Sequence, residues 1–299
     1  MSTATPILHM LTPQKHMSPF DVNMAADAGF KVIVPYVNVL PEEVTALVQD
    51  AIFSRPPQDG VRTGMFIGGK DAILALDMME AAKNAMVPPF QVSVFADPAG
   101  SFTTAAAMVA CVERQLKQKF NRTLKGTRIA VFGATGVVGF ASSIIAALEG
   151  ADVQLVAHRG VERVIKSAEL SKARFGVDLE AVDGESDDQK REIIANAEVI
   201  FAAAAAGVRV VSAEHKALAK NLLIAADVNA VPPPGVEGME LFMDGAQLPG
   251  CSALGIGPLA IGDIKYKTES GLFKQMIASD QPLHLDFRHA FAMARELVA

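Results

Sequence analysis

A short apolar run followed by three evenly spaced glycines constrains this chain more than any other stretch. Arg128–Phe132 is too rich in buried-type residues for an exposed strand, so it predicts a central strand of a parallel sheet. Gly133, Gly136 and Gly139 follow directly, and residues 140–148 continue as an apolar helix. Strand, glycine turn and helix in this order are typical of dinucleotide binding, with the pyrophosphate on the helix N-terminus. The alternative is a βα corner that uses its glycines for packing alone.

The end of the next expected strand, residues 153–157, indicates which dinucleotide is bound. No acid stands there; Arg159 follows, with His158 beside it and Arg163 one turn further on. An acid at this place would bind the ribose of NAD, whereas arginine suits the 2′-phosphate of NADP. We therefore expect NADP to be preferred and NAD to be accepted.

Small residues at a later strand end and a polar turn after the next strand complete the expected nucleotide site. Asn229 in that turn holds the nicotinamide carboxamide or an edge of the substrate, or is an ordinary turn residue. The expected cofactor-binding residues are Gly133, Ala134, Thr135, Gly136, Val137, Val138, Gly139, His158, Arg159, Arg163, Ala203, Ala204, Asp227 and Asn229.

Composition excludes several classes of protein. A chain of 299 residues with 51% hydrophobic residues has on the order of two domains and a sizeable core. The net charge of −6 and the lack of a basic stripe argue against a nucleic-acid partner. Cys111 and Cys251 have neither metal-ligand spacing nor a disulfide framework. Because neither a signal peptide nor a membrane span is recognisable, we expect a soluble cytoplasmic protein.

Strands and helices alternate along the whole chain, which predicts an α/β fold. We expect two domains: an N-terminal α/β substrate domain, and a C-terminal Rossmann-like domain with a doubly wound parallel sheet. The polar link around 121–126 places the boundary. The expected regions are 1–123 for the substrate domain, 124–258 for the nucleotide domain, and 259–299 for C-terminal helices that return over the cleft and the first domain.

Three polar loops in the first domain, at 13–20, 54–63 and 97–104, are candidates for contact with a substrate. Each has an ordinary alternative. Arg55 and Arg62 are equally consistent with a solvated loop, and Ser101 or Thr103 with a plain helix cap.

Six motifs, taken with the spacing between them, resemble the NAD(P)-dependent methylenetetrahydromethanopterin dehydrogenases of methylotrophic bacteria. The resemblance spans essentially the whole chain and is closer to the branch that accepts both NAD and NADP. The motifs are SPFDVNMA (18–25), RPPQDGVRTGMFIGG (55–69), FADPAGSFTTAAA (95–107), GATGVVG (133–139), DVNAVPPPG (227–235) and AIGDIKYK (260–267).

The resemblance implies hydride transfer from the methylene bridge of a reduced pterin to the nicotinamide. The adjacent nitrogen lone pair expels the hydride, so the protein mainly has to hold two rings together and exclude water. This demand is consistent with the lack of a Ser-His-Asp, paired-carboxylate or metal constellation. In the related methylenetetrahydrofolate dehydrogenase/cyclohydrolases a Tyr-x-x-x-Lys pair serves a second activity; here Tyr36 is followed by Leu40, so that activity is not expected.

The resemblance also implies a substrate site. Lys265 would orient the pterin without accepting a proton, the alternative being a solvated helix lysine. Phe20 and Phe102 would form apolar walls, and Lys15, His16, Arg55 and Arg62 would meet the anionic tail. The full set of expected substrate-binding residues is Lys15, His16, Phe20, Asp21, Arg55, Arg62, Asp97, Ser101, Phe102, Thr103 and Thr104. No metal is expected, and the family resemblance implies a homo-oligomer.

Two other classes of protein stay open at this point. One is a different dehydrogenase on the same scaffold, acting on shikimate or methylenetetrahydrofolate. The other is a non-catalytic NADP-sensing protein, against which the polar loops of the first domain argue.

Overall fold

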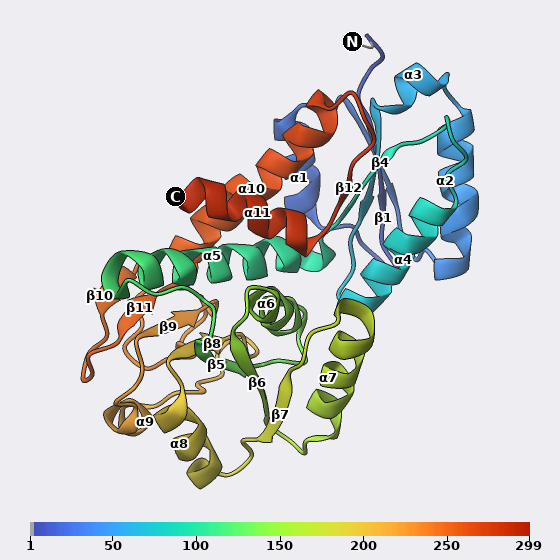
Figure 1. Cartoon of the computed structure of the whole chain (residues 1–299). Helices are drawn as coiled ribbons and strands as arrows, with labels where there is room; N and C mark the ends of the chain where they lie inside the picture. Colours follow the sequence, from blue (N-terminus) through green and yellow to red (C-terminus); the bar gives the residue numbers. More distant parts are fainter. Residues whose placement is uncertain (1–2) are drawn as a thin grey trace. The chain divides into compact units, whose positions relative to one another are not determined.

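The computed structural model describes residues 3–299 and divides into two compact units (Figure 1). The first unit runs up to Thr103 and includes Tyr266–Met293; the second comprises Thr104–Lys265 and Ala294–Ala299. The division therefore falls inside a long helix, α5 (Ser101–Phe120), and not in the expected polar link at 121–126. The expected C-terminal region, 259–299, is shared between the two units.

The first unit is built on a parallel five-stranded sheet, counted over residues 3–299, in the order β12-β4-β3-β1-β2. Buried side chains fill β3 and β4 at every position, as expected for strands covered on both faces. The short strand β12 had no recognisable pattern in the sequence. The strands are β1 (Ile7–Leu11), β2 (Val32–Tyr36), β3 (Thr63–Ile67), β4 (Ser93–Ala96) and β12 (His284–Leu285).

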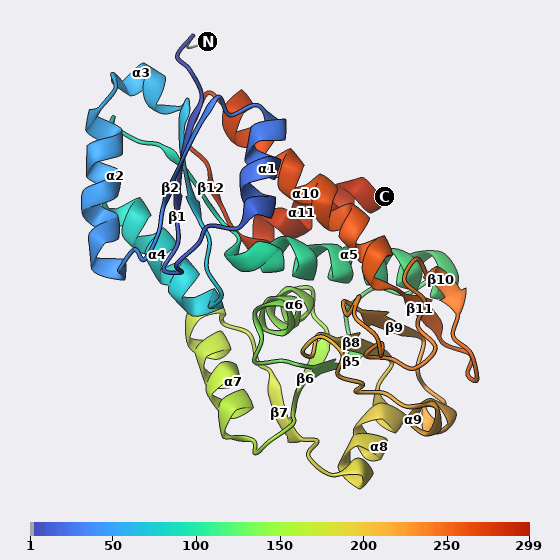
Figure 2. The ribbon, with the colours of Figure 1, turned by 180° about the vertical axis from the view of Figure 1, so that it is seen from behind.

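Helices cover both faces of this sheet. α2 and α4 lie on one face and α1 on the other, with the C-terminal part of α10 beside α1 (Figures 1 and 2). Phe273 of α10 packs against Phe66 and Phe95 of the sheet, with ring centroids 5.5 and 5.2 Å apart. The helical segments are α1 (Pro19–Ala28), η1 (Pro41–Glu43), α2 (Val44–Phe53), α3 (Pro57–Gly60), α4 (Ala72–Asn84) and η2 (Pro98–Gly100).

The second unit contains a seven-stranded sheet, again over the described residues, in the order β10-β11-β9-β8-β5-β6-β7. The strand pairs are parallel except β10–β11. The doubly wound α/β fold predicted from the sequence is thus confirmed, with β10 and β11 as strands that the sequence pattern did not indicate. The strands are β5 (Arg128–Phe132), β6 (Asp152–Ala157), β7 (Glu180–Asp183), β8 (Val199–Ala202), β9 (Ile224–Asp227), β10 (Asp244–Gln247) and β11 (Leu254–Ile256).

Right-handed crossovers place α6 and α7 on one face of the second sheet and α8 and α9 on the other. Two long helices, α10 and α11, follow β11 and β12. Across residues 3–299 no helix combines the length and apolar character needed to cross a membrane. The remaining helices are α6 (Val137–Leu148), α7 (Glu162–Phe175), α8 (Asp187–Asn196), α9 (Ala213–Leu218), α10 (Pro258–Ala278) and α11 (Phe287–Val298).

Each sheet has one point where the direction of strand addition reverses. In the first unit this point lies between β1 and β3, and in the second between β5 and β8. Loops leave the carboxyl ends of the two central strands toward opposite faces there and open a crevice, the usual ligand position in α/β proteins. Each unit therefore has one place where a ligand is expected on topology alone.

Candidate functional site

The glycine turn after β5 lies at the reversal point of the second sheet, and each glycine has a separate reason. Gly133 has φ +80°, and a Cβ there would stand 2.2 Å from the Ala203 carbonyl oxygen. A Cβ on Gly139 would stand 2.3 Å from the Gly133 carbonyl oxygen, so this residue allows α6 to pack on the turn. At Gly136 the nearest atom to a Cβ is 3.3 Å away. Packing alone thus explains Gly133 and Gly139, whereas Gly136 leaves the helix end open.

The N-terminus of α6 is suited to an anion. Gly136 is the N-cap and has no side chain that could bond the first amides of the helix. The first N–H groups of a helix lack partners within it, and the helix dipole makes this end positive. These amides are therefore suited to a pyrophosphate, and binding of one by residues 137–139 stays a prediction.

A pocket of about 320 Å³ opens beside this turn at the carboxyl edge of the sheet. It collects Gly133, Ala134, Thr135, His158, Arg159, Arg163 and Ala204 from the predicted set. Other parts of its wall were not predicted. They are Phe132, Val156, Ala157, Gly160, Val164, Gly184, Lys190, Ala205, Val208, Arg209 and Val210.

The charge of this pocket is one-sided, because its lining contains three arginines, a lysine and a histidine but no carboxylate. Arg209 is paired with Glu237 at 3.2 Å. Among residues 3–299, no carboxylate pairs with Arg159, Arg163 or Lys190. Cationic side chains without internal partners favour an anionic ligand. Nearby, the Glu162 carboxylate turns back onto Gly160, where a Cβ would stand 2.5 Å from its Oε2.

Asp227 and Asn229 are occupied within their own loop. Asp227 is buried and accepts hydrogen bonds from the amides of Asn229 and Val236, both at 2.9 Å. Burial raises the pKa of the Asp227 carboxyl, and these backbone donors oppose the rise. The side-chain amide of Asn229 donates through Nδ2 to the Pro233 carbonyl, and its Oδ1 accepts from the backbone amide of Val231. The turn reading of Asn229 thus accounts for its contacts, and a role in ligand binding stays a prediction.

A second pocket, of about 470 Å³, lies at the reversal point of the first sheet. The loop after β1 supplies Lys15 and His16, the loop after β3 supplies Lys70, and Asp21 comes from α1. Lys15, His16 and Asp21 were predicted for a ligand. Lys70 was missed, although its place directly behind a strand and two glycines was a usable signal. The lining is completed by Thr12, Gln14, Met17, Ser18, Pro19, Gly69 and Ala99.

Asp97, Phe102 and Thr103 have structural tasks and not the expected contact with a ligand. The Asp97 carboxylate accepts from the amides of Phe102 and Thr103 and, at 2.6 Å, from the Thr103 hydroxyl. Asp97, and not Ser101 or Thr103, therefore caps α5. The Phe102 ring is fully buried against Phe287, with centroids 5.3 Å apart. The expected roles of Phe102 as a ligand wall and of Thr103 as a ligand contact are corrected accordingly.

Arg55 and Arg62 do not join Lys15 and His16. Both precede β3 and lie at the amino edge of the sheet, whereas Lys15 and His16 follow β1 at the carboxyl edge. Arg55 donates to the carbonyl of Thr5, and Arg62 donates to the carbonyl of Ile277. The expectation that all four cations meet one anionic tail is therefore corrected, because the two pairs lie at opposite ends of parallel strands.

The other predicted substrate residues keep their status as predictions. Phe20 is 46% exposed on α1. Ser101 and Thr104, at the start of α5, are half-buried. Lys265 is half-buried on α10, whereas Lys267 is exposed, in keeping with their different directions on a helix.

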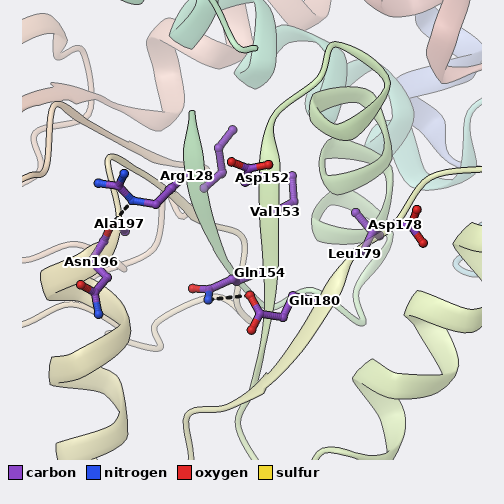
Figure 3. A pocket seen from close by; sticks show the side chains of 10 residues that line it. Arg128, Asp152, Val153, Gln154, Asp178, Leu179, Glu180, Asn196 and Ala197 are labelled. Carbon is purple, nitrogen blue, oxygen red and sulfur yellow. Dashed lines mark hydrogen bonds between the residues drawn. The ribbon is translucent and has the colours of Figure 1, made fainter. Parts of the chain in front are cut away.

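A further hollow of the second unit, of about 480 Å³, lies at the amino edge of its sheet (Figure 3). Figure 3 shows Asp152 and Asp178 in its wall and Gln154 bonded to Glu180. Arg128 faces the opposite side and donates to the Asn196 carbonyl. Three carboxylates make this hollow unsuitable for a dinucleotide, so the cationic pocket at the carboxyl edge is the candidate site. Within residues 3–299, no three metal-ligating side chains form a group that could hold a metal ion.

Comparison with known proteins shows similarity to one family model and to whole chains. Residues 19–99 match the family model described as methylene-tetrahydromethanopterin dehydrogenase, N-terminal. The quinate dehydrogenase of Corynebacterium glutamicum, solved in complex with NAD, is similar in fold, with a TM-score of 0.55 at 14% identity. That similarity covers 97% of this chain and 98% of the other.

Two proteins of Methylorubrum extorquens are similar in sequence. The bifunctional protein MdtA is 31% identical over 94% of each chain. The NAD(P)-dependent methylenetetrahydromethanopterin dehydrogenase is 55% identical over 98% of this chain and 99% of its own length. With that identity over nearly the full length of both proteins, this chain belongs to the family of NAD(P)-dependent methylenetetrahydromethanopterin dehydrogenases.

Proposed function

We propose that this protein oxidises methylene-tetrahydromethanopterin to its methenyl form by hydride transfer to NADP⁺ or NAD⁺. The observation that carries the proposal is the cationic pocket without carboxylates beside the glycine turn, in a chain 55% identical to a dehydrogenase of that name. The topology supports both halves of the reaction, since each unit has its own reversal point with a pocket.

The second unit would hold the nucleotide through its own backbone and side chains. The amides at the start of α6 take the pyrophosphate, and Arg159 and Arg163 take the 2′-phosphate when it is present. Val208 and Val210 offer an apolar surface to a ring. The bound nicotinamide supplies the hydride acceptor. Because no acidic residue is part of the pocket lining, NADP⁺ is the favoured nucleotide, and NAD⁺ binds through the contacts that the two share.

The first unit would hold the substrate at its own reversal point. Lys15, His16 and Lys70 provide positive charge for the anionic tail of the pterin. Ser101 at the start of α5 is the polar side chain of this unit proposed to meet the pterin itself, with Phe20 as an apolar wall. Lys265 is proposed to orient the ring. Since the product is a cation, Lys265 would not act as a proton acceptor.

The chemistry asks little of the side chains beyond position. The nitrogen lone pair next to the methylene carbon expels the hydride, so neither a general base nor a nucleophile is required. Holding the methylene carbon near the acceptor and keeping water away accounts for most of the acceleration in such a step.

The test is a steady-state assay of NADPH and NADH formation. Methylene-tetrahydromethanopterin, methylene-tetrahydrofolate and shikimate are compared side by side with each nucleotide. Turnover of the methanopterin substrate in clear excess over the other two is expected. Turnover of shikimate or of the folate alone would replace the proposed substrate, and tight NADP⁺ binding without any turnover would favour a nucleotide sensor.

We further propose a homo-oligomer that works in the cytoplasm. The family membership supports both statements, and the two cysteines, both free, suit a reducing compartment. Light scattering on the purified protein measures the assembly; a monomer at micromolar concentration would contradict the first statement. Fractionation of the source cells tests the second.

A further inference from the structure

The nucleotide pocket of the second unit contains two cations besides Arg159 and Arg163. Arg159 and Arg163 belong to the segment that follows β6. Lys190 stands on α8, and Arg209 lies in the segment between β8 and α9. In the strand order β8-β5-β6-β7, Arg159, Arg163 and Lys190 come from segments that follow strands on one side of β5, and Arg209 comes from the segment after β8 on the other side.

The position of Lys190 is set by the start of α8. Ser186 and Gln189 form a reciprocal capping box, with Gln189 Oε1 accepting from the Ser186 amide at 2.8 Å. Gln189 also donates to Asp183 at the end of β7 at 2.8 Å. These contacts fix the first turn of the helix to the carboxyl edge of the sheet. Lys190 follows directly and reaches the pocket as a half-buried side chain.

The charge environment separates Lys190 from its neighbour. Arg191 has two carboxylate partners, Asp187 at 2.7 Å and Glu214 at 3.2 Å. Lys190 has no carboxylate partner among residues 3–299. Arg191 thus forms ion pairs at the protein surface, whereas Lys190 lines the pocket without a carboxylate partner among the described residues.

Arg209 is oriented by an ion pair with Glu237. Its guanidinium donates to Glu237 Oε2 at 3.2 Å, and the same oxygen accepts from the Ala213 amide at 3.1 Å. Glu237 therefore fixes the direction of Arg209 while the arginine lines the pocket. The planar guanidinium keeps further donors for a phosphate or for stacking on a ring.

We propose that Lys190 and Arg209 recognise the 2′-phosphate of NADP together with Arg159 and Arg163, with Glu237 as the positioning residue for Arg209. This inference rests on the proposed nucleotide site, and it adds two residues that discriminate NADP from NAD. A phosphate held by cations from several segments binds in a defined position, whereas NAD lacks the phosphate group that these cations would bind.

Binding of nucleotides to the full-length protein tests the inference without any turnover. Calorimetric titrations with NADP⁺, NAD⁺, 2′-AMP and 5′-AMP compare the wild type with Lys190→Ala. We expect the affinity for NADP⁺ and 2′-AMP to fall about tenfold, with NAD⁺ and 5′-AMP changed less than about twofold. Lys220→Ala is the matched control, because it removes an exposed lysine of the same unit outside the pocket. Equal losses for all four ligands, or no loss, would overturn the role of Lys190.

Further variants separate charge from folding. Lys190→Arg keeps the charge and should retain most of the NADP⁺ affinity, while thermal unfolding checks that each variant is folded. Arg209→Ala and Glu237→Gln should both raise KM for NADP⁺ and leave KM for NAD⁺, the second by less. An unchanged ratio of the two constants in both variants would remove Arg209 and Glu237 from the proposal. A wild type that binds NADP⁺ without turning over any pterin would contradict the proposed function but not this inference.

Discussion

The reversal points of the two sheets use the same topology but different means. At the β5–β8 point the chain approaches itself so closely that a Cβ on Gly133 would stand 2.2 Å from the Ala203 carbonyl oxygen. At the β1–β3 point the neighbouring loop is supported by a side chain, since the buried Asp97 carboxylate accepts three hydrogen bonds from Phe102 and Thr103. The second unit offers free backbone amides beside its cationic side chains, and the first offers side chains alone on a loop held by Asp97.

This difference explains what each place can recognise. Free amides at a helix end suit a group common to many ligands, such as a pyrophosphate. Side chains drawn from separate loops suit the distinctive parts of one substrate. The largest effects of substitution are expected at the close approach of Gly133 to Ala203 and at the Asp97 carboxylate.

Gly133→Ala should cause the largest loss. The new methyl group would clash with the Ala203 carbonyl, and the left-handed backbone of Gly133 is unfavourable for alanine. We expect the free energy of unfolding to fall by about 3–5 kcal/mol and the binding of both nucleotides to be lost. Urea unfolding and NADP⁺ titration measure the two effects. Gly176→Ala is the control, because Gly176 also has a positive φ but no atom within 4 Å of a Cβ; it should cost about 1–2 kcal/mol. Equal losses in the two variants would mean that contact with Ala203 is unimportant.

Asp97→Ala should destabilise the first unit by about 2–4 kcal/mol, because two buried amides lose their acceptor and the Thr103 hydroxyl keeps only the Gly100 carbonyl, at 3.2 Å. Asp71→Ala provides the matched comparison: Asp71 caps α4 through two amides at an exposed position and should cost about 1 kcal/mol. Urea unfolding of both variants gives the difference. A smaller loss for Asp97→Ala than for Asp71→Ala would show that the brace is not a stabilising feature.

Asp286 supplies a pH-dependent part of the stability of the first unit. Burial opposes its ionisation, yet hydrogen bonds from His289 and Arg288 hold the pKa of this carboxyl at about 2. A depressed pKa stabilises the folded state above the unfolded value near 3.8, and the gain is lost as the pH falls toward 2. Asp286→Asn should therefore cost about 2 kcal/mol at pH 7 and progressively less between pH 4 and 2. A difference from the wild type that does not change with pH would contradict this account.

Arg159→Ala should weaken NADP⁺ binding by about 1–2 kcal/mol, or roughly five- to thirtyfold in KM, with little change for NAD⁺. The lost interaction is the charged contact with the 2′-phosphate. Arg128→Ala removes an arginine from the opposite edge of the same sheet, beside the hollow of Figure 3, and should leave both Michaelis constants unchanged. Parallel effects of Arg159→Ala on the two nucleotides would show that this arginine does not read the phosphate.

Lys70→Ala should have the smallest effect. We expect KM for the pterin substrate to rise about fivefold, which corresponds to about 1 kcal/mol of binding free energy, with no change in KM for either nucleotide. Lys70 is exposed and screened by solvent, which limits its contribution. Arg55→Ala tests the correction made above, since Arg55 lies at the amino edge and should not change this constant. A larger effect of Arg55 than of Lys70 would restore the original expectation.

The residues around the candidate nucleotide pocket could be brought together from the sequence because most of them are local in sequence. Gly133, Gly136 and Gly139 each have backbone requirements that few other residues meet, and Arg159 follows the neighbouring strand. Lys190 could not be predicted in this way, because its place in the pocket depends on how α8 packs after β7, far from the glycine turn in the sequence.

The substrate loops were harder to predict for a physical reason. A polar residue at the start of a helix faces either a ligand or the helix itself, and the sequence does not say which; Thr103 faces Asp97. Arg62 could have been placed correctly, because a residue that directly precedes a parallel strand lies at its amino edge. Phe102 was misplaced for a similar reason. An aromatic ring beside polar residues can line a ligand site or belong to the core, and this ring is buried in the core.

The close approach of Gly133 to Ala203 also bears on motion. The Ala203 amide donates to Phe132, the Val228 amide to Ala202, and the Gly136 amide to Gly133. Three successive strand ends are thus joined by backbone hydrogen bonds around a contact that has no room to slide. Local opening of one turn would require the others to open with it, so we expect this carboxyl edge of the sheet to open as one cooperative unit. A ligand arriving there meets a surface that is already in place, and little ordering of the backbone remains to be done at binding.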